Sequence, residues 1–265
     1  MNSRLKNGSP DAGQAILASP RSCLPVAVLP QELGTKPEDS IQPDSKRPAL
    51  KAGVRNGAIS RDMHYAIQLD GSCHIISEDY SYKSDTYYSI LRQEMDGRTV
   101  RPSSATVLDA YVVPVCLERA RLAGIPVCEW GISQGYAPLP SIVYGLNYFA
   151  STADFSVVHD SEKSKEIIKH ITNKGKYPFC FQKLNDGAEI QSTVSIFGKT
   201  ADDDTGISAL ARQVYDLFAI PLVTIVFVRY DGRCLLSSLS PTRYSRLSVA
   251  ERTLLAAYLS HQEFL

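Results

Sequence analysis

The residue types best suited to ligand recognition gather in one short stretch. Residues 80–89 contain four tyrosines and three serines, at a point where a strand is expected to give way to a helix. Their hydroxyls donate and accept hydrogen bonds, and tyrosine rings offer faces for stacking. The predicted substrate-binding residues are Tyr80, Tyr82, Ser84, Tyr87, Tyr88, Arg101 and Ser103.

The predicted ligand is a small polar molecule or a carboxylate. Arg101 can pair with a carboxylate, and free N–H groups at the start of the expected helix can hold a carboxylate or phosphate. A second interpretation stays open, in which Tyr82 and Tyr87 simply pack between a helix and a sheet.

A serine motif offers an alternative chemistry. Residues 131–135 match G-x-S-x-G, which in hydrolases exposes a nucleophile such as Ser133 on a turn between a strand and a helix. Asp160 and His170 follow in an order that a catalytic triad could use. Residues 136–140 contain two prolines and do not begin a regular helix, so a connecting loop is favoured. The catalytic residues stay unknown, and a small stand-alone enzyme using Ser133 or the 80–88 cluster remains an alternative.

Other motifs give no support for a cofactor or a metal ion. Residues 197–200 resemble the end of a phosphate-binding loop, but Thr193 stands where that loop needs a glycine. The acidic run 202–204 is more typical of a helix N-terminus than of a cation site. The five histidines lack the spacing of a zinc site. We therefore predict neither a cofactor nor a metal.

Charge and composition divide the chain into two parts. Its 28 basic and 28 acidic residues balance, which argues against binding nucleic acid through bulk positive charge. Residues 1–60 hold 7 of the 15 prolines, no aromatic residue, and 8 basic against 5 acidic side chains. We predict a disordered tail over 1–60 and one folded domain over 61–265. The tail could also dock a partner protein and fold on binding.

The cysteines and the apolar runs indicate a cytoplasmic protein. None of the six cysteines forms a C-x-x-C pair, so buried and reduced thiols are expected. No stretch has the features of a secretory signal or a membrane span, so no membrane contact is expected.

Hydrophobic periodicity and turn signals predict an α+β fold, with a small strand–helix–strand lobe followed by β-hairpins packed with helices. Helices are expected over 86–96, 104–123 (kinked or split at Pro114), 161–173, 206–218 and 248–261. Strands are expected over 65–69, 74–76, 99–101, 125–129, 141–145, 177–184, 188–197, 221–230 and 233–239. Turns at 70–71, 185–187 and 231–232 are expected to close hairpins.

Two blocks of the sequence resemble a known family. Residues 81–103 read S-Y-x-S-x-x-Y-Y-S-x-L and then G-R-x-V-x-P-S, and residues 197–222 read F-G-K-T-A-D, L-A-R-x-V-Y-x-L-F and P-L. These blocks are similar to the domain found N-terminal to RimK-like ATP-grasp ligases, over roughly residues 63–262. Thr86 and Arg98 replace a glycine and a histidine of the family pattern.

The resemblance implies a function through a partner. The family's domain is an α+β unit that is usually fused to an ATP-grasp ligase, which joins a carboxylate to an amine. The resemblance therefore implies an accessory or substrate-recognition protein for an ATP-grasp amide ligase or another pathway enzyme, in specialised peptide or metabolite biosynthesis. The ATP chemistry would belong to that partner.

Overall fold

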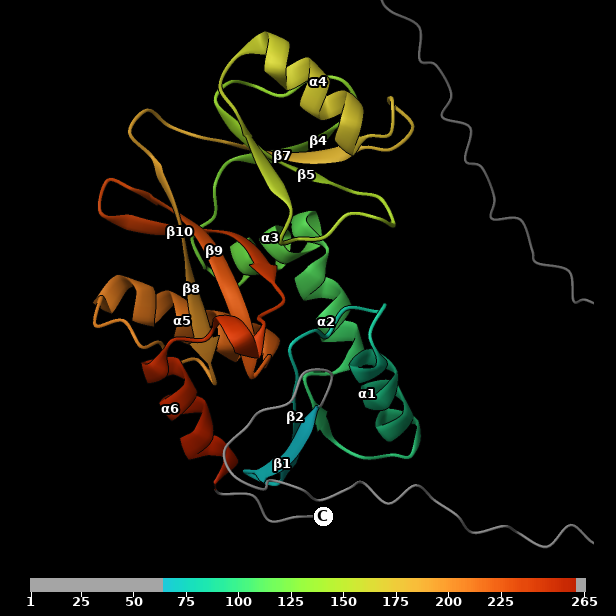
Figure 1. Cartoon of the computed structure of the whole chain (residues 1–265), viewed down its shortest axis with the longest axis vertical. Coiled ribbons are helices and arrows are strands. Elements are labelled where there is room, and N and C mark those ends of the chain that lie inside the picture. The colour runs from blue at the N-terminus through green and yellow to red at the C-terminus, as the bar shows by residue number, and fades with distance from the viewer. Residues whose placement is uncertain (1–63, 261–265) are drawn as a thin grey trace, which may run out of the picture. The chain divides into compact units, whose positions relative to one another are not determined.

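The computed structural model describes residues 64–260 (Figure 1). The predicted tail over 1–60, with Cys23, lies outside the described residues, and so does the predicted helix end at His261. The division of the chain into a tail and one domain stays a prediction.

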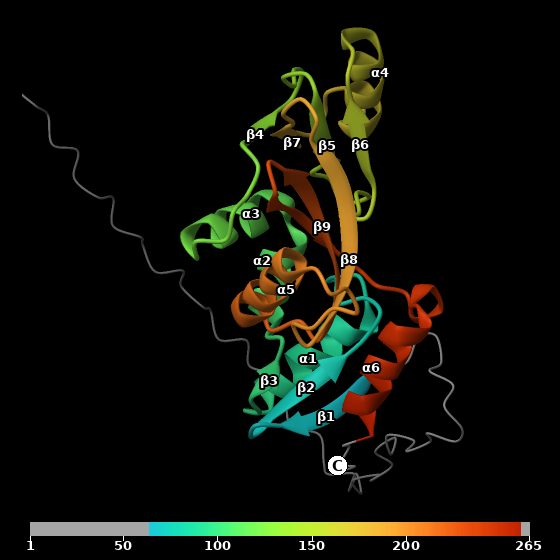
Figure 2. The same cartoon turned by 90° about the vertical axis from the view of Figure 1, so that its left-hand side faces the viewer.

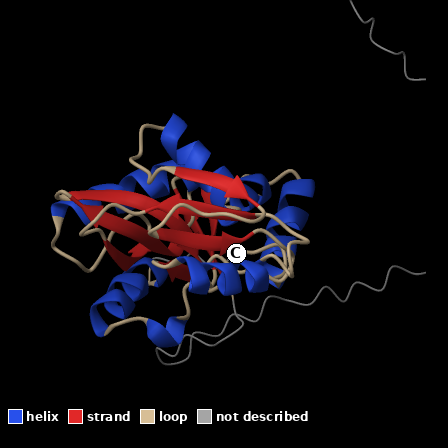
Figure 3. Ribbon diagram, turned by 90° about the horizontal axis from the view of Figure 1, so that it is seen from above, coloured by secondary structure: helices blue, strands red, loops and turns tan. Residues whose placement is uncertain are grey.

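The described part of the chain is built from six α-helices and three small sheets, which confirms the α+β class. Figure 3 shows helices on both sides of the strands. The helices are α1 (Asp85–Met95), α2 (Ser104–Tyr111), α3 (Val113–Leu122), α4 (Ser161–Ile171), α5 (Thr205–Phe218) and α6 (Val249–Leu259). The strands are β1 (Tyr65–Leu69), β2 (Ser72–Ile76), β3 (Val100–Arg101), β4 (Trp130–Ser133), β5 (Ser141–Gly145), β6 (Phe155–Val158), β7 (Phe179–Lys183), β8 (Glu189–Ile196), β9 (Leu222–Tyr230) and β10 (Arg233–Ser240).

The first sheet forms the predicted strand–helix–strand lobe. β2 pairs antiparallel with β1 and parallel with β3, and α1 connects β2 to β3. Asp70 and Gly71 both have positive φ angles, of 49° and 75°, as a type I′ turn requires. The turn signal therefore identified this hairpin correctly.

The long helix expected over 104–123 is divided in two. α2 ends at Tyr111 and α3 begins at Val113, with Val112 extended between them (φ −105°, ψ 100°). Pro114 lies in the first turn of α3, where its missing N–H costs nothing and its ring meets no preceding turn. The helix is therefore split near Pro114, which was one of the two predicted outcomes, a kink or a split.

The second sheet has the order β4-β7-β5-β6 and packs against α4 (Figure 1). The strand expected over 125–129 is misplaced: these residues contribute only an isolated bridge at Val127, and the strand is β4. β6 was not expected. Ile168 of α4 packs with Val143, Val158 and Phe179 of the sheet.

The third sheet corrects a predicted hairpin. β7 and β8 flank the turn at 185–187 but belong to different sheets, because β7 pairs with β4 and β5 whereas β8 pairs with β9. The hairpin expected at Asp231-Gly232 is confirmed: β9 and β10 pair antiparallel across it, with a register shift between Leu236 and Ser238.

Buried apolar side chains hold the sheets and helices together. The main core cluster contains Ile75 of β2, Ile90 of α1, Val214 of α5 and Phe227 of β9, each at most 1% exposed. Burial of such a side chain stabilises the fold by about 1.5–3 kcal/mol. Two further clusters connect β9 with the second sheet and α6 with β1 and β2.

The five described cysteines are free, and all but Cys234 are buried, as expected. Burial raises the pKa of the Cys128 and Cys180 thiols to about 12. Among residues 64–260, no helix is long and apolar enough to cross a membrane.

Candidate functional site

Tyr80, the first residue of the predicted site, belongs to the core. Its side chain is 0% exposed. Its hydroxyl accepts a hydrogen bond from the Ser77 N–H (2.9 Å) and donates one to the Ile75 carbonyl (3.1 Å). Burial raises the pKa of Tyr80 well above its usual value, so the hydroxyl stays protonated. Tyr80 thus joins the loop after β2 to the core and does not reach a ligand at the surface.

The two serines of the predicted site cap helices. Ser84 Oγ accepts from the N–H of Tyr87 (3.3 Å) at the start of α1 and donates to the Ser81 carbonyl (2.8 Å). Ser103 Oγ accepts from the N–H of Thr106 (3.1 Å) at the start of α2. A cap satisfies donors that a bound anion would otherwise use. These helix ends are therefore already partly occupied by the chain's own side chains.

The paired tyrosines of α1 lie in different surroundings. Tyr87 is partly buried against the main core cluster, as its packing alternative predicted. Tyr88 is 48% exposed, and its ring meets that of Tyr87 edge to face, with centroids 5.5 Å apart. The Tyr88 side chain is therefore accessible to solvent, and its ring packs against the partly buried ring of Tyr87.

An exposed group of aromatic side chains surrounds Lys83, and we call Tyr82, Lys83, Tyr148 and Phe149 the aromatic surface. The rings of Tyr82 and Tyr148 lie 6.0 Å apart, and those of Tyr148 and Phe149 lie 5.5 Å apart. Lys83 Nζ lies 5.6 Å from the Tyr82 ring centroid and 4.7 Å from that of Tyr148. It also donates to the Tyr148 carbonyl. The lysine thus connects two loops that are distant in the sequence, by cation–π contacts and a hydrogen bond.

The aromatic surface is open to solvent. Tyr148 and Phe149 are 63% and 81% exposed, and Tyr82 is 38% exposed. Grouped exposed aromatic side chains are unusual, because burial of large apolar rings is favourable. The group offers stacking faces, two phenol hydroxyls and one ammonium to a polar or anionic partner.

The sequence reading missed Tyr148 and Phe149. They lie in the loop after β5, where Asn147 Oδ1 accepts from the N–H groups of Phe149 (2.9 Å) and Ala150 (3.0 Å). The Asn147 amide also donates to the Ile171 carbonyl (2.7 Å), which fixes the loop to the end of α4. The available signal was an asparagine-led turn with two adjacent aromatic residues.

Arg101 has different neighbours from the residues of the aromatic surface. It is exposed on β3, opposite His74 of β2 in the parallel register. No hydrogen bond, ion pair or ring contact joins Arg101 to the aromatic surface within residues 64–260. Burial lowers the pKa of the His74 imidazole, and the charge of Arg101 lowers it further. His74 Nδ1 lies 3.5 Å from the Tyr215 hydroxyl.

Ser133 ends β4 and leads into a turn, without the strand–helix setting of a nucleophile elbow. Its Oγ accepts from the N–H groups of Gly135 (3.4 Å) and Tyr136 (3.2 Å). Asp160 caps α4 by accepting from the Lys163 N–H (2.8 Å). Nothing in the described residues bonds Ser133 to Asp160 or to His170, so the geometry gives no support to a hydrolase triad.

The acidic run 202–204 also has a structural role. Asp204 caps α5 by accepting from the N–H groups of Gly206 (2.8 Å) and Ile207 (3.1 Å), and it forms an ion pair with Arg229. The Arg229 guanidinium holds the pKa of the Asp204 carboxyl below its usual value. No group of three metal-ligating side chains occurs in the part of the chain that the structure describes.

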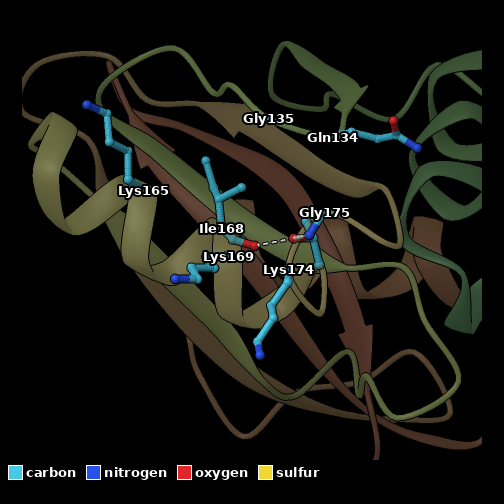
Figure 4. Close-up of a pocket in the computed structure, with 8 residues that line it drawn as sticks. Gln134, Gly135, Lys165, Ile168, Lys169, Lys174 and Gly175 are labelled. Atoms are coloured by element: carbon cyan, nitrogen blue, oxygen red, sulfur yellow. Dashed lines mark hydrogen bonds between the residues drawn. The ribbon is translucent and has the colours of Figure 1, made fainter.

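A basic pocket of about 310 Å³ lies beside α4 (Figure 4). It is lined by Lys165, Lys169 and Lys174, with Gln134 and Gly135 across from them. Figure 4 shows the three ammonium groups pointing in different directions, so they do not converge on one anion. Lys169 lies in the last turn of α4, where a positive charge stabilises the carbonyl groups at the helix end.

The chain is similar to known proteins over most of its described length. Residues 151–258 match the family model of the RimK-like ATPgrasp N-terminal domain. This confirms the resemblance, with its second block inside the matched range and its first block, 81–103, outside it. No curated protein sequence matches the chain.

Solved structures of two other proteins share the fold. One is a RimK domain ATP-grasp protein from Sphaerobacter thermophilus, with 15% identity over 66% of this chain and 76% of that chain and a TM-score of 0.50. Another is a D-alanine–D-alanine ligase from Bacillus anthracis, with 11% identity over 69% of this chain and 75% of that chain and a TM-score of 0.52. At these identities the likeness concerns the fold alone.

Proposed function

We propose that this chain is an accessory or substrate-recognition protein for an ATP-grasp carboxylate–amine ligase in a specialised peptide or amide pathway. The observation that carries the proposal is the match of residues 151–258 to the RimK-like ATPgrasp N-terminal domain. The resemblance implies a domain that is usually fused to an ATP-grasp ligase, which forms the amide bond. We further propose that this chain is cytoplasmic, where ATP is available and thiols stay reduced.

The aromatic surface is the proposed contact with the ligase or with its substrate. Tyr82, Tyr148 and Phe149 are exposed and lie ring to ring, and Lys83 adds one positive charge among them. Tyrosine is enriched among the residues that supply most of the binding free energy in protein interfaces, and phenylalanine is enriched in interfaces generally. Stacking with hydrogen bonding suits a peptide chain or a polar amino-acid derivative.

The acyl-phosphate chemistry is assigned to the ligase. We derive no catalytic step from the residues that the structure describes. Their contribution is to bind and orient.

The test is a co-purification of the full-length chain with a RimK-like ATP-grasp ligase, followed by reconstitution of the pair. ADP release by the ligase is measured with its carboxylate and amine substrates, with and without the full-length chain. The proposal predicts a faster ligase rate or a lower KM when the chain is added. An unchanged kcat and KM, together with no co-purification, would refute it.

A further inference from the structure

A second surface of interest is the free edge of the sheet β10-β9-β8. β8 pairs with β9 on one side, and no other strand of the described chain pairs with its outer side (Figure 2). An unpaired strand edge presents N–H and C=O groups that can pair with another extended segment. β8 is long for such an edge, with eight residues.

The hydrogen bonds at the end of β8 identify the groups that face outward. The Phe197 N–H donates to a carbonyl just before β9 (2.7 Å), whereas Ile196 exchanges hydrogen bonds with Lys199 on the other side. Backbone groups alternate between the two sides along a strand. The N–H and C=O of Ser192 and Val194 therefore point away from β9, and neither residue has a backbone partner on that side among residues 64–260.

An acidic groove runs beside these outward groups. It has a volume of about 560 Å³ and is bordered by residues 192–194 of β8. Three of its eight lining residues are acidic, namely Asp202, Asp203 and Glu251, and none is basic. The groove therefore favours a cationic side chain beside the strand edge.

Two of these carboxylates are held in place. Asp202 Oδ1 accepts from the Asp204 N–H (3.0 Å), and Glu251 Oε2 accepts from the Ser248 N–H (2.6 Å) as part of a capping box. These bonds use one oxygen of each carboxylate. The other oxygen can accept from an incoming ammonium or guanidinium.

We infer that the outer edge of β8 binds an extended peptide segment that carries lysine or arginine. The segment adds as a strand beside Ser192 and Val194, and its basic side chains enter the groove. Strand addition gives affinity through the main chain, and the flanking pocket selects the side chain. A second copy of this chain is disfavoured, because pairing two β8 edges would bring two acidic grooves together.

The test uses a synthetic peptide with blocked ends, in which valine alternates with threonine and lysine. The matched controls are the same peptide with glutamate for lysine and the same peptide methylated at alternate backbone nitrogens. Backbone NMR of the full-length chain follows the Ser192 and Val194 amides, and fluorescence anisotropy gives the affinity. The lysine peptide should slow hydrogen exchange at both amides, and each control should bind about tenfold more weakly or not at all.

Two variants complete the test. Ser192→Pro removes an outward donor at an exposed edge position, where proline is tolerated, and it should abolish peptide binding. Should that variant fail to fold, the double variant Asp202→Asn with Asp203→Asn keeps the side-chain shape and should weaken binding about tenfold.

Three results would overturn the inference. One is equal binding of the lysine and glutamate peptides. The second is slow exchange at Ser192 and Val194 without any peptide, which would mean that another segment of this chain covers the edge. The third is sedimentation as a dimer with both amides protected. No ligase is needed, so the outcome is independent of the proposed function.

Discussion

Removing one hydroxyl oxygen from Tyr80 should destabilise the fold more than any change to the exposed tyrosines nearby. Tyr80→Phe keeps the ring in the core and deletes the oxygen that bonds both the Ser77 N–H and the Ile75 carbonyl. Ser77 and Ile75 are themselves buried, so no solvent replaces the lost partner. The substitution leaves a buried donor and a buried acceptor unsatisfied.

The magnitude follows from those two groups. An unsatisfied buried polar group costs about 1–3 kcal/mol, and partial relaxation of one of them gives an expected loss of about 2 kcal/mol in the free energy of unfolding. For a folded part of about 200 residues this corresponds to a fall in Tm of about 4–8 °C. Urea unfolding followed by circular dichroism gives the free energy, and a thermal scan gives the Tm.

The matched control is Tyr82→Phe, which removes the same atom from a side chain that is 38% exposed. Its free energy of unfolding should stay within about 0.5 kcal/mol of the parent. Equal stability of Tyr80→Phe and Tyr82→Phe would refute the assignment of Tyr80 to the core and of Tyr82 to the surface.

Three further predictions concern single positions. Gly198 has a φ of +75°, and an added Cβ would lie 2.9 Å from the Tyr215 Cβ, so Gly198→Ala should cost about 1–3 kcal/mol, whereas Gly135→Ala, with open space around it, should be neutral in urea unfolding. The pKa of His74 is lowered in the folded state, so the unfolded chain takes up the proton first and Tm should fall as pH drops below about 6.5. His74→Gln should flatten this dependence of Tm on pH. An unchanged dependence would contradict the lowered pKa of His74 in the folded state. Ser133→Ala should leave stimulation of the ligase unchanged in the ADP-release assay, since Ser133 Oγ only accepts turn hydrogen bonds.

Local signals in the sequence predicted most helices and their starting points. Ser84 and Ser248 accept capping hydrogen bonds at the starts of α1 and α6, and Pro114 marks the break between α2 and α3. These features depend on residues within one helical turn of each other, so spacing along the chain is enough to find them.

Strand pairing was harder to predict, because it depends on distant residues. The turn at 185–187 suggested that β7 and β8 form a hairpin. However, β7 pairs with β4 and β5, which lie more than thirty residues earlier in the chain. A turn signal alone does not determine which strand will pair with each of the two flanking strands. The short β6 gave no alternation long enough to be recognised.

The candidate site also depends on residues that are distant in the sequence, so composition indicates only part of it. The segment 80–89 was singled out by composition, but its members separate into a core residue, capping serines and exposed rings only once the fold is known. Tyr148 and Phe149 join Tyr82 across more than sixty residues of sequence through Lys83, a contact that no local pattern indicates.

The central claim, recognition through the aromatic surface, is tested most directly by the affinity of this chain for the RimK-like ATP-grasp ligase with which it is proposed to act. Isothermal titration compares the full-length chain with the double variant Tyr82→Ala and Phe149→Ala. Tyr230→Ala serves as control, because Tyr230 has the same 38% exposure as Tyr82 but lies at the β9–β10 turn. The account predicts that Kd rises by about tenfold or more for the double variant and stays unchanged for the control; an equal Kd for all three proteins would contradict it.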